Sequence, residues 1–419
     1  AQFDLGWCCA SGRGVTKDEV EAAKWWRKAA EQKHSGAQFN LGNCYARGRG
    51  VAKDEVEAVE WYRKAAEQNH AEAQHCLGNC YAGGHGVAKD SVEAAKWYGK
   101  AAEQSDSGAQ FSLGSCYYSG QGVAKDEVEA VKWWRRAAEQ NLAPAQHRLG
   151  NCYASGQGVA RNEAEAVKWW HKAAAQNDAA SQYSLGTCYY CGQGVTKDEA
   201  EAVKWWRRAA EQNYGLAQCH LGACYQSGQG VEKNYLEAVK WFRKASEQNY
   251  PKAEYALGVC CFSGEGLVKD DAEGVKWFRK AAEHNDPRGQ WTLGNCYFWG
   301  RGVTKDPGEA VKWLRKAAEG GVVDALNPLA WILATSGNSA IRDGTSAVIF
   351  AEKAVAATNR KSPAELDTLA VAYAETGQFD KAVSIQQEAI ALLQTEAEKN
   401  DYGAHLKLFE AKMPYRAND

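Results

Sequence analysis

The sequence predicts an all-α solenoid built from repeated pairs of antiparallel helices. A Leu-Gly pair recurs nine times at one spacing, from Leu5-Gly6 through Leu41-Gly42 (41 − 5 = 36 residues) to Leu293-Gly294. The interval between pairs contains two amphipathic segments separated by glycines. A fixed period of this length is typical of stacked repeats, in which each unit buries its apolar face against its neighbours. The chain is therefore counted in repeats rather than in globular domains.

The first helix of each unit, called helix A, is predicted over residues 37–46 in the second copy. Its small or apolar residues Ala37, Leu41, Cys44 and Tyr45 follow helical spacing. At about 100° per residue they fall within one arc, which we expect to be the packed face.

A glycine turn leads to the second helix, called helix B. Gly48 is expected to end helix A, and Asp54 followed by Glu57 predicts an N-cap with a capping box at the start of helix B. The equivalent pair Asp306/Glu309 encloses a proline at the first helical position. Helix B then carries one apolar stripe, made of Ala58, Val59, Trp61, Tyr62, Ala65 and Ala66. We expect Trp61 and its equivalents to face helix A, and the aromatic residue that follows each to fill the gap between repeats.

The unit A-x-x-x-L-G-x-x-Y-x-x-G-x-G-V-x-K-D-x-x-E-A-V-K-W-x-R-K-A-A-E, read from copies such as Ala109 to Glu139, closely resembles the Sel1-like repeat. The resemblance covers residues 1–324, with the first copy truncated at its N-terminus. It implies a relative of tetratricopeptide repeats, a right-handed superhelix with helix A on its concave side, and a non-catalytic adaptor or scaffold that binds protein partners.

The repeat period fails after Ala325. We predict a divergent tenth hairpin over residues 325–361, a tetratricopeptide-like repeat over 362–394, and a capping helix with a tail over 395–419. Because residue 1 falls inside a repeat, we also expect the native N-terminus, with any signal peptide, to lie upstream.

Composition narrows the classes of partner. Lys and Arg (50) nearly balance Asp and Glu (52), giving a net charge of −2, so nucleic acid is an unlikely partner, although a local basic patch stays possible. No apolar run approaches the roughly 20 residues that span a bilayer, so membrane insertion is not expected.

The predicted binding surface is the part of helix A that varies among copies. These positions lie opposite the packed face and are, in the second copy, Gly36, Phe39, Asn40, Asn43, Ala46 and Arg47. Asn presents both a donor and an acceptor to a peptide backbone, and aromatic residues are typical of protein-binding hot spots. The candidate contacts are Phe39, Asn43, Arg47, His75, Asn79, Ser115, Tyr118, Asn151, Thr187, Tyr190, Phe262, Trp291, Asn295, Phe298 and Trp299.

The Asn residues of this surface either contact a bound peptide or have no binding role. In tetratricopeptide domains the corresponding helix A position commonly carries a peptide-contacting Asn, which supports Asn43, Asn79 and Asn151. Only Arg47 offers a cation nearby, so a carboxylate clamp is not expected. The row of Asn residues could instead be merely solvated, or it could bridge neighbouring repeats.

The chain could also be the regulatory or partner-binding part of a larger enzyme or effector complex whose catalytic domain is upstream or on another chain.

The cysteines are expected to be structural. Nine of the 14 recur once per repeat on the packed face of helix A, where each acts as a small apolar residue. Secreted relatives pair two cysteines within each repeat, and those positions hold Ala66 and Gln74 here, which favours a reducing, cytoplasmic compartment. His75 and His147 show no carboxylate partner at useful spacing, so we expect no catalytic site, metal, cofactor or small-molecule substrate.

Overall fold

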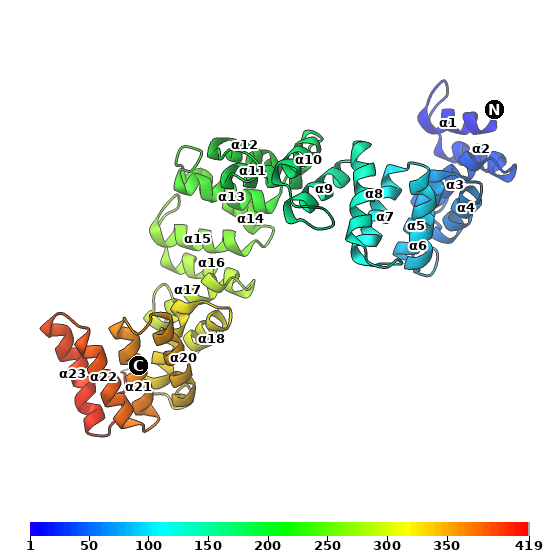
Figure 1. The fold of residues 1–419 in the computed structure, drawn as a ribbon. Helices are drawn as coiled ribbons and strands as arrows, with labels where there is room; N and C mark the ends of the chain where they lie inside the picture. Colours follow the sequence, from blue (N-terminus) through cyan, green and yellow to red (C-terminus); the bar gives the residue numbers. More distant parts are fainter. Residues whose placement is uncertain (418–419) are drawn as a thin grey trace. The chain divides into compact units, whose positions relative to one another are not determined.

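The computed structural model describes residues 1–417 and contains helices and turns, with no strand among those residues. Its elements pack as consecutive hairpins (Figure 1), which confirms the predicted α/α solenoid. Residues 418–419, at the end of the predicted tail, lie outside the described residues. The helices of the repeats are α1 (Gln2–Ser11), α2 (Glu19–Glu31), α3 (Ser35–Arg47), α4 (Glu55–Glu67), α5 (Ala71–Gly83), α6 (Ser91–Glu103), α7 (Ser107–Ser119), α8 (Glu127–Glu139), α9 (Ala143–Ser155), α10 (Glu163–Ala175), α11 (Ala179–Cys191), α12 (Glu199–Glu211), α13 (Gly215–Ser227), α14 (Tyr235–Ser246), α15 (Pro251–Ser263), α16 (Asp271–Glu283), α17 (Pro287–Trp299) and α18 (Pro307–Glu319).

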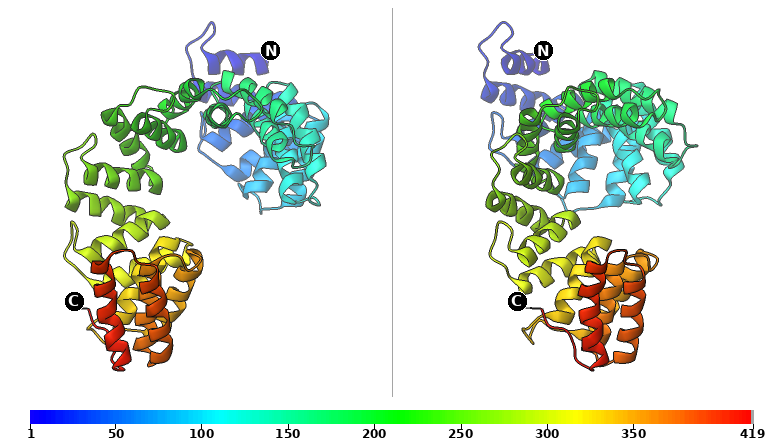
Figure 2. Two further views of the ribbon diagram at one scale, coloured as in Figure 1. Left: turned by 60° about the vertical axis from the view of Figure 1, so that its left-hand side comes forward. Right: turned by 90° about the vertical axis from the view of Figure 1, so that its left-hand side faces the viewer.

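Two compact units divide the chain, Ala1–Gln212 with α1–α12 and a second unit from Asn213 onward. In both, odd-numbered helices up to α17 are helix A of a repeat and the following even-numbered helices are helix B. Figure 2 shows the helices of each unit following one another in sequence order. The second unit continues with η1 (Val323–Ala325), α19 (Leu326–Thr335), α20 (Gly344–Ala357), α21 (Pro363–Glu375), α22 (Phe379–Ala391) and α23 (Glu396–Glu410).

The ends of the helices confirm the capping residues predicted from the sequence. Gly48 ends α3 in the left-handed conformation with φ of 66°, a geometry that costs glycine little. Asp54 Oδ1 accepts hydrogen bonds from the backbone N–H groups of Val56 and Glu57 at 3.0 and 3.1 Å, which satisfies two of the free donors at the start of α4.

The predicted capping box is wrong, because the N-cap backbone N–H already has another partner. In the fourth repeat, Asp126 Oδ1 accepts from Glu129 N–H at 2.9 Å, but Asp126 N–H donates to the Tyr117 carbonyl of helix A at 2.9 Å. The Glu129 carboxylate instead binds Lys132 Nζ one turn along, at 2.7 Å. The N-cap thus joins helix B to helix A, and the acidic residue turns to the solvent.

The helices of one repeat meet where the Leu-Gly glycine faces the second aromatic residue of helix B. A Cβ atom added to Gly114 would lie 2.7 Å from the Trp134 ring, and Trp134 is only 1% exposed. The same contact joins Gly6 to Trp26, Gly42 to Tyr62, Gly78 to Tyr98, Gly150 to Trp170, Gly186 to Trp206, Gly222 to Phe242 and Gly258 to Phe278.

The two aromatic residues of helix B divide their packing differently from the prediction, because the second one packs both on helix A of its own repeat and on the next repeat. Trp133 belongs to the apolar cluster that holds Leu113 of its own helix A. Trp134 packs in the next cluster, with Ala145 and Leu149 of the following repeat. The Trp at the first of the two positions is half-buried in several repeats, and a basic side chain covers it, as Arg136 covers the Trp133 ring at 4.5 Å.

Buried glutamines connect successive repeats. Gln38, 3% exposed, donates from Nε2 to the Ala30 carbonyl of the preceding helix B at 3.1 Å, and its Oε1 accepts from Gln68 Nε2 at 2.6 Å. In the second unit a Glu replaces the buried Gln. The carboxylate of Glu254, 1% exposed, binds His284 Nδ1 at 2.8 Å.

We expect Gly114→Ala to destabilise the first unit by about 1–3 kcal/mol, because the new methyl group must displace a buried indole ring. Gly99 is a matched control in the same unit, since a Cβ atom there meets nothing within 4 Å. Gly99→Ala should stabilise α6 by about 0.5–1 kcal/mol through helix propensity alone. Urea denaturation followed by circular dichroism measures both, and equal effects would contradict the proposed contact.

Loss of His284 should leave a buried carboxylate without a partner. We expect His284→Ala to lower the free energy of unfolding by about 1–3 kcal/mol. The double variant Glu254→Gln/His284→Gln restores the pair found in the other repeats and should differ from the parent by less than about 1 kcal/mol. A double variant as unstable as the single one would show that the pair does not act as a unit.

Candidate functional site

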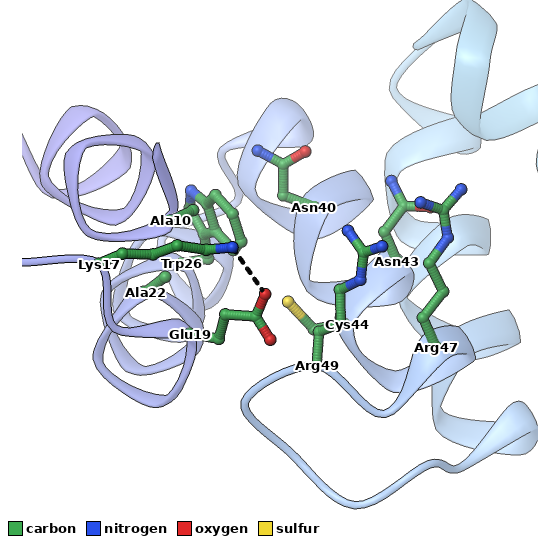
Figure 3. Close-up of a pocket in the computed structure, with 10 residues that line it drawn as sticks. All are labelled: Ala10, Lys17, Glu19, Ala22, Trp26, Asn40, Asn43, Cys44, Arg47 and Arg49. Atoms are coloured by element: carbon green, nitrogen blue, oxygen red, sulfur yellow. Dashed lines mark ion pairs between the residues drawn. The ribbon is translucent and has the colours of Figure 1, made fainter. Parts of the chain in front are cut away.

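The positions of helix A that vary among copies line cavities in both units. In the first unit, a cavity of about 240 Å³ is bounded by Trp26 and Lys17 on one side and by Asn43, Arg47 and Arg49 on the other (Figure 3). Lys17 Nζ pairs with Glu19 at 3.5 Å, so Arg47 and Arg49 carry the positive charge of this cavity.

Another cavity in the first unit lies one repeat further along. Asn79 lines it together with Cys76, Tyr62 and His85, and its volume is about 280 Å³. Asn43 and Asn79 thus face different cavities rather than one continuous pocket. Neither cavity is lined by Ser115, Tyr118, Asn151, Thr187 or Tyr190.

The second unit brings four of the predicted contacts together. Trp291, Asn295, Phe298 and Trp299, all on α17, line a cavity of about 380 Å³. Phe262 lies outside this group and packs edge-to-face on Phe278, with the Arg301 guanidinium 4.2 Å from its ring centroid.

One further cavity in the second unit is lined mainly by variable positions of helix A whose residues were not among the named candidate contacts. Its apolar wall includes Phe242 and Val259, and its charged side chains are Lys252 and Arg288, in a volume of about 400 Å³. Lys252 and Arg288 stand at equivalent positions of successive repeats, 36 residues apart (288 − 252 = 36). Comparison of the copies for charge, and not only for Asn and aromatic residues, would have found this pair.

The Sel1 repeat model matches nine consecutive segments that together cover residues 1–322: 1–34, 35–70, 71–106, 107–142, 143–178, 179–214, 215–250, 251–286 and 287–322. This chain belongs to the Sel1 repeat family. Each of the nine matched segments contains one helix A and one helix B.

Solved structures agree with this assignment. A protective antigen of uropathogenic Escherichia coli strains, described as displaying an SLR fold, is 32% identical over 100% of this chain and 96% of its own, with a TM-score of 0.53. A Sel1 repeat protein from Oxalobacter formigenes is also 32% identical, over 72% of this chain and 87% of its own, with a TM-score of 0.57. No curated protein matches the sequence.

In the second to eighth Sel1 repeats, the variable position at Asn43 and its equivalents is paired with the second aromatic residue of helix B. Where helix A carries Asn, the aromatic side chain donates a hydrogen bond to Oδ1: from Tyr62 to Asn43 at 2.9 Å, from Tyr98 to Asn79 at 2.8 Å and from Trp170 to Asn151 at 3.1 Å. These bonds fix each amide group, so Oδ1 is directed at helix B.

The other repeats of this group avoid an unpaired donor on helix B in one of two ways. Where helix A carries Ser115 or Thr187, that hydroxyl donates to the carbonyl one turn back, and the opposing indole donates to the same carbonyl, as Trp134 Nε1 does to Phe111 at 3.1 Å. Where helix A carries Ala223 or Val259, helix B carries a Phe, which has nothing to donate. Part of the variation at this position therefore follows from packing within the repeat.

Tyr118, Tyr190 and Phe39 are half-buried and stack on neighbouring rings. Tyr118 lies 5.3 Å from Trp134 and Tyr190 5.4 Å from Trp206, measured between ring centroids. Phe39 stacks on the His70 ring at 5.0 Å.

The prediction that His75 and His147 have no carboxylate partner is wrong. His75 Nδ1 lies 3.2 Å from Asp106, and His147 Nδ1 lies 3.6 Å from Asp178. Each Asp is the N-cap of the next helix A, so the stacking of repeats brings together residues about 31 positions apart (106 − 75 = 31). Burial lowers the pKa of His147 despite the opposing effect of Asp178.

The cysteines are free thiols, as predicted, and most are buried. Burial raises the pKa of Cys44, Cys152 and Cys188 to about 11 each. Cys191, by contrast, is exposed. Among residues 1–417, His, Cys, Asp and Glu side chains form no group of three or more that could hold a metal ion.

At pH 8 a thiol with a pKa near 11 is ionised in about one molecule in a thousand, and the thiolate is the reactive form. We therefore expect iodoacetamide to modify Cys191 quickly and Cys44, Cys152 and Cys188 slowly in the folded chain, as mass spectrometry of the digested protein would show. The same reagent in guanidinium chloride should label all four. Equal labelling rates in the folded chain would contradict the burial of these thiols.

Proposed function

We propose that this chain is a non-catalytic scaffold that binds a protein or peptide partner on the exposed helix A surface of its repeats. The helix A surface is defined by the positions of Gly36, Phe39, Asn40, Asn43, Ala46 and Arg47 and by their equivalents in the other repeats. Sel1 repeat proteins are in general protein-interaction scaffolds, and the family is typically non-catalytic.

One observation carries the proposal: the cavities of both units are lined by the variable positions of helix A. The cavity around Lys252 and Arg288 draws nine of its ten lining residues from these positions, in three successive repeats: Cys219, His220, Ala223, Gln226, Lys252, Tyr255, Ala256, Val259 and Arg288. Cavities are where partner side chains lose the most solvent, and binding energy concentrates in such places.

The Asn residues supply a polar part of this surface. Asn43 and Asn79 use Oδ1 for helix B, and within residues 1–417 no hydrogen bond from their Nδ2 groups is recorded. Two oriented N–H donors can bind the carbonyls of an extended peptide. Asn151 differs, because its Nδ2 lies 3.1 Å from His147 Nε2.

The proposal includes a protein partner in a reducing compartment such as the cytoplasm. Fourteen free cysteines support such a compartment. The near balance of 50 basic and 52 acidic residues argues against nucleic acid as the partner. Among residues 1–417, no helix combines the length and apolar character required to cross a bilayer.

Replacement of Asn43, Asn79 and Asn151 by Ala tests the proposal, provided that helix B is adjusted as well. Without the Asn residues, the hydroxyl or indole N–H of helix B would have no acceptor. The native Ala223/Phe242 pair avoids this, because Phe has no donor. We therefore combine the three changes with Tyr62→Phe, Tyr98→Phe and Trp170→Phe. The two lost hydrogen bonds, from Asn43 and Asn79, at about 0.5–1.5 kcal/mol each should weaken capture of a native-host partner about fivefold or more.

The matched control carries only the three changes to Phe and keeps every Asn. Its affinity for the captured partner, measured by titration, should stay within about threefold of the parent, as one weakened hydrogen bond allows. Circular dichroism establishes that both variants are folded. If the variant without the three Asn residues binds as tightly as this control, the Asn residues do not contact the partner.

A further inference from the structure

The second unit contains a cavity walled by aromatic rings from three helices, α17, α19 and α23. Its volume is about 380 Å³, and it opens where α17, α19, α21 and α23 pack together. The aromatic residues that line it are Trp291, Phe298, Trp299, Trp331 and Tyr402. Trp299 is 74% exposed, so the rim is open to solvent.

Two side-chain acceptors of this cavity have no partner among residues 1–417. Asp324 lines the wall, and among residues 1–417 its carboxylate forms no ion pair. Trp291 Nε1 donates to the Asp324 backbone carbonyl at 3.2 Å, which holds the indole ring beside this acid. Asn327 Oδ1 is buried and receives no hydrogen bond from any described residue.

The charge around the cavity is negative. Of the residues that line it, two are Asp, and neither Lys nor Arg is among them. Asp367 is 6% exposed and accepts hydrogen bonds from Gln386 Nε2 at 2.7 Å and His405 Nδ1 at 2.8 Å. Burial raises the pKa of Tyr402, and the carboxylates of Asp367, Glu365 and Glu398 raise it further.

These features fit a positively charged group better than an apolar one. The faces of Trp and Tyr rings attract a cation, and Trp does so most strongly. An apolar side chain would fill the space but leave the buried Asn327 Oδ1 without a donor. An ammonium or guanidinium group supplies N–H donors and positive charge together.

We infer that this cavity receives the cationic side chain of a Lys or Arg residue from a bound partner peptide. The inference rests on the proposed scaffold function and names one chemical feature of the partner. The rings enclose the cation, Asp324 balances its charge, and Asn327 Oδ1 accepts one of its N–H groups.

Capped single amino acids test the cavity without a partner protein. The probes are N-acetyl-lysine methylamide and N-acetyl-arginine methylamide, with N-acetyl-norleucine methylamide as the neutral control of similar shape. The full chain is labelled with 5-fluorotryptophan, and the resonances of Trp291, Trp299 and Trp331 are assigned from single changes to Phe. We expect saturable ¹⁹F shifts at these three residues with the cationic probes and none with norleucine.

Two variants locate the charge and the acceptor. Asp324→Asn should weaken binding of the cationic probes roughly threefold to fivefold, and Asn327→Leu, which keeps the branched shape but removes the acceptor, should weaken it by a similar factor. The control Glu283→Gln removes an exposed carboxylate of the same unit that does not line the cavity, and it should change binding by less than about twofold.

Three results would overturn the inference: equal shifts with norleucine, no shift at the three Trp residues, or an Asp324→Asn variant that binds the cationic probes as the Glu283→Gln control does. The probes report on the cavity alone, so failure of partner capture by the Asn variants leaves this result unaffected. Conversely, if the cavity does not bind the cationic probes, the test of the Asn residues in the first unit is unaffected.

Discussion

The contact between the Leu-Gly glycine and the second aromatic residue of helix B is the constraint on which each repeat depends. Because glycine has no Cβ, the ring of Trp134 lies where a side chain on Gly114 would otherwise stand. This contact sets both the distance between the two helices and the face that helix A turns inward. The same ring then packs on the next repeat, so the geometry within one hairpin also determines how the hairpins stack. The opposite arc of helix A is left for solvent or for a partner.

Because of this contact, part of the variation among the helix A positions reflects packing within the repeat rather than partner binding. The position of Asn43 is not independent of the fold, since a ring that can donate meets an acceptor, as Tyr62 meets Asn43, whereas Phe278, which cannot donate, meets Val259. A donor on helix B requires an acceptor on helix A, because a buried hydroxyl or indole N–H without a partner is costly. Asn295 departs from the pattern, because it faces Leu314, which has no donor, and it lines the aromatic cavity instead. Its amide is therefore the member of the row that packing explains least.

Local signals in the sequence were sufficient for the fold and for the boundaries of its helices. Glycine at a left-handed C-cap and Asp at an N-cap are short-range requirements, so Gly48 and Asp54 could be identified from their neighbours. Contacts between repeats were harder to predict. His75 meets Asp106 only after two repeats have stacked. Contacts between the two helices of one repeat were missed as well, because the Asp126 N–H bonds a carbonyl of helix A and the capping box is therefore absent. Only the α17 residues of the aromatic cavity were predicted, because they follow the repeat period. Trp331 and Tyr402 were not predicted, because they lie on helices beyond the last Sel1 repeat.

The cavities of the two units differ in chemistry on the same backbone frame. Near the start of the chain, Asn43 and Arg47 give a polar cavity, whereas the later repeats present either apolar walls with Lys252 and Arg288 or aromatic walls with Asp324. Arg288 and Trp291 lie about one turn apart on α17, so the positively charged cavity and the aromatic cavity adjoin on this helix. Because each repeat fixes its own helix pair, this pattern can change one side chain at a time, provided that the ring on helix B changes with it.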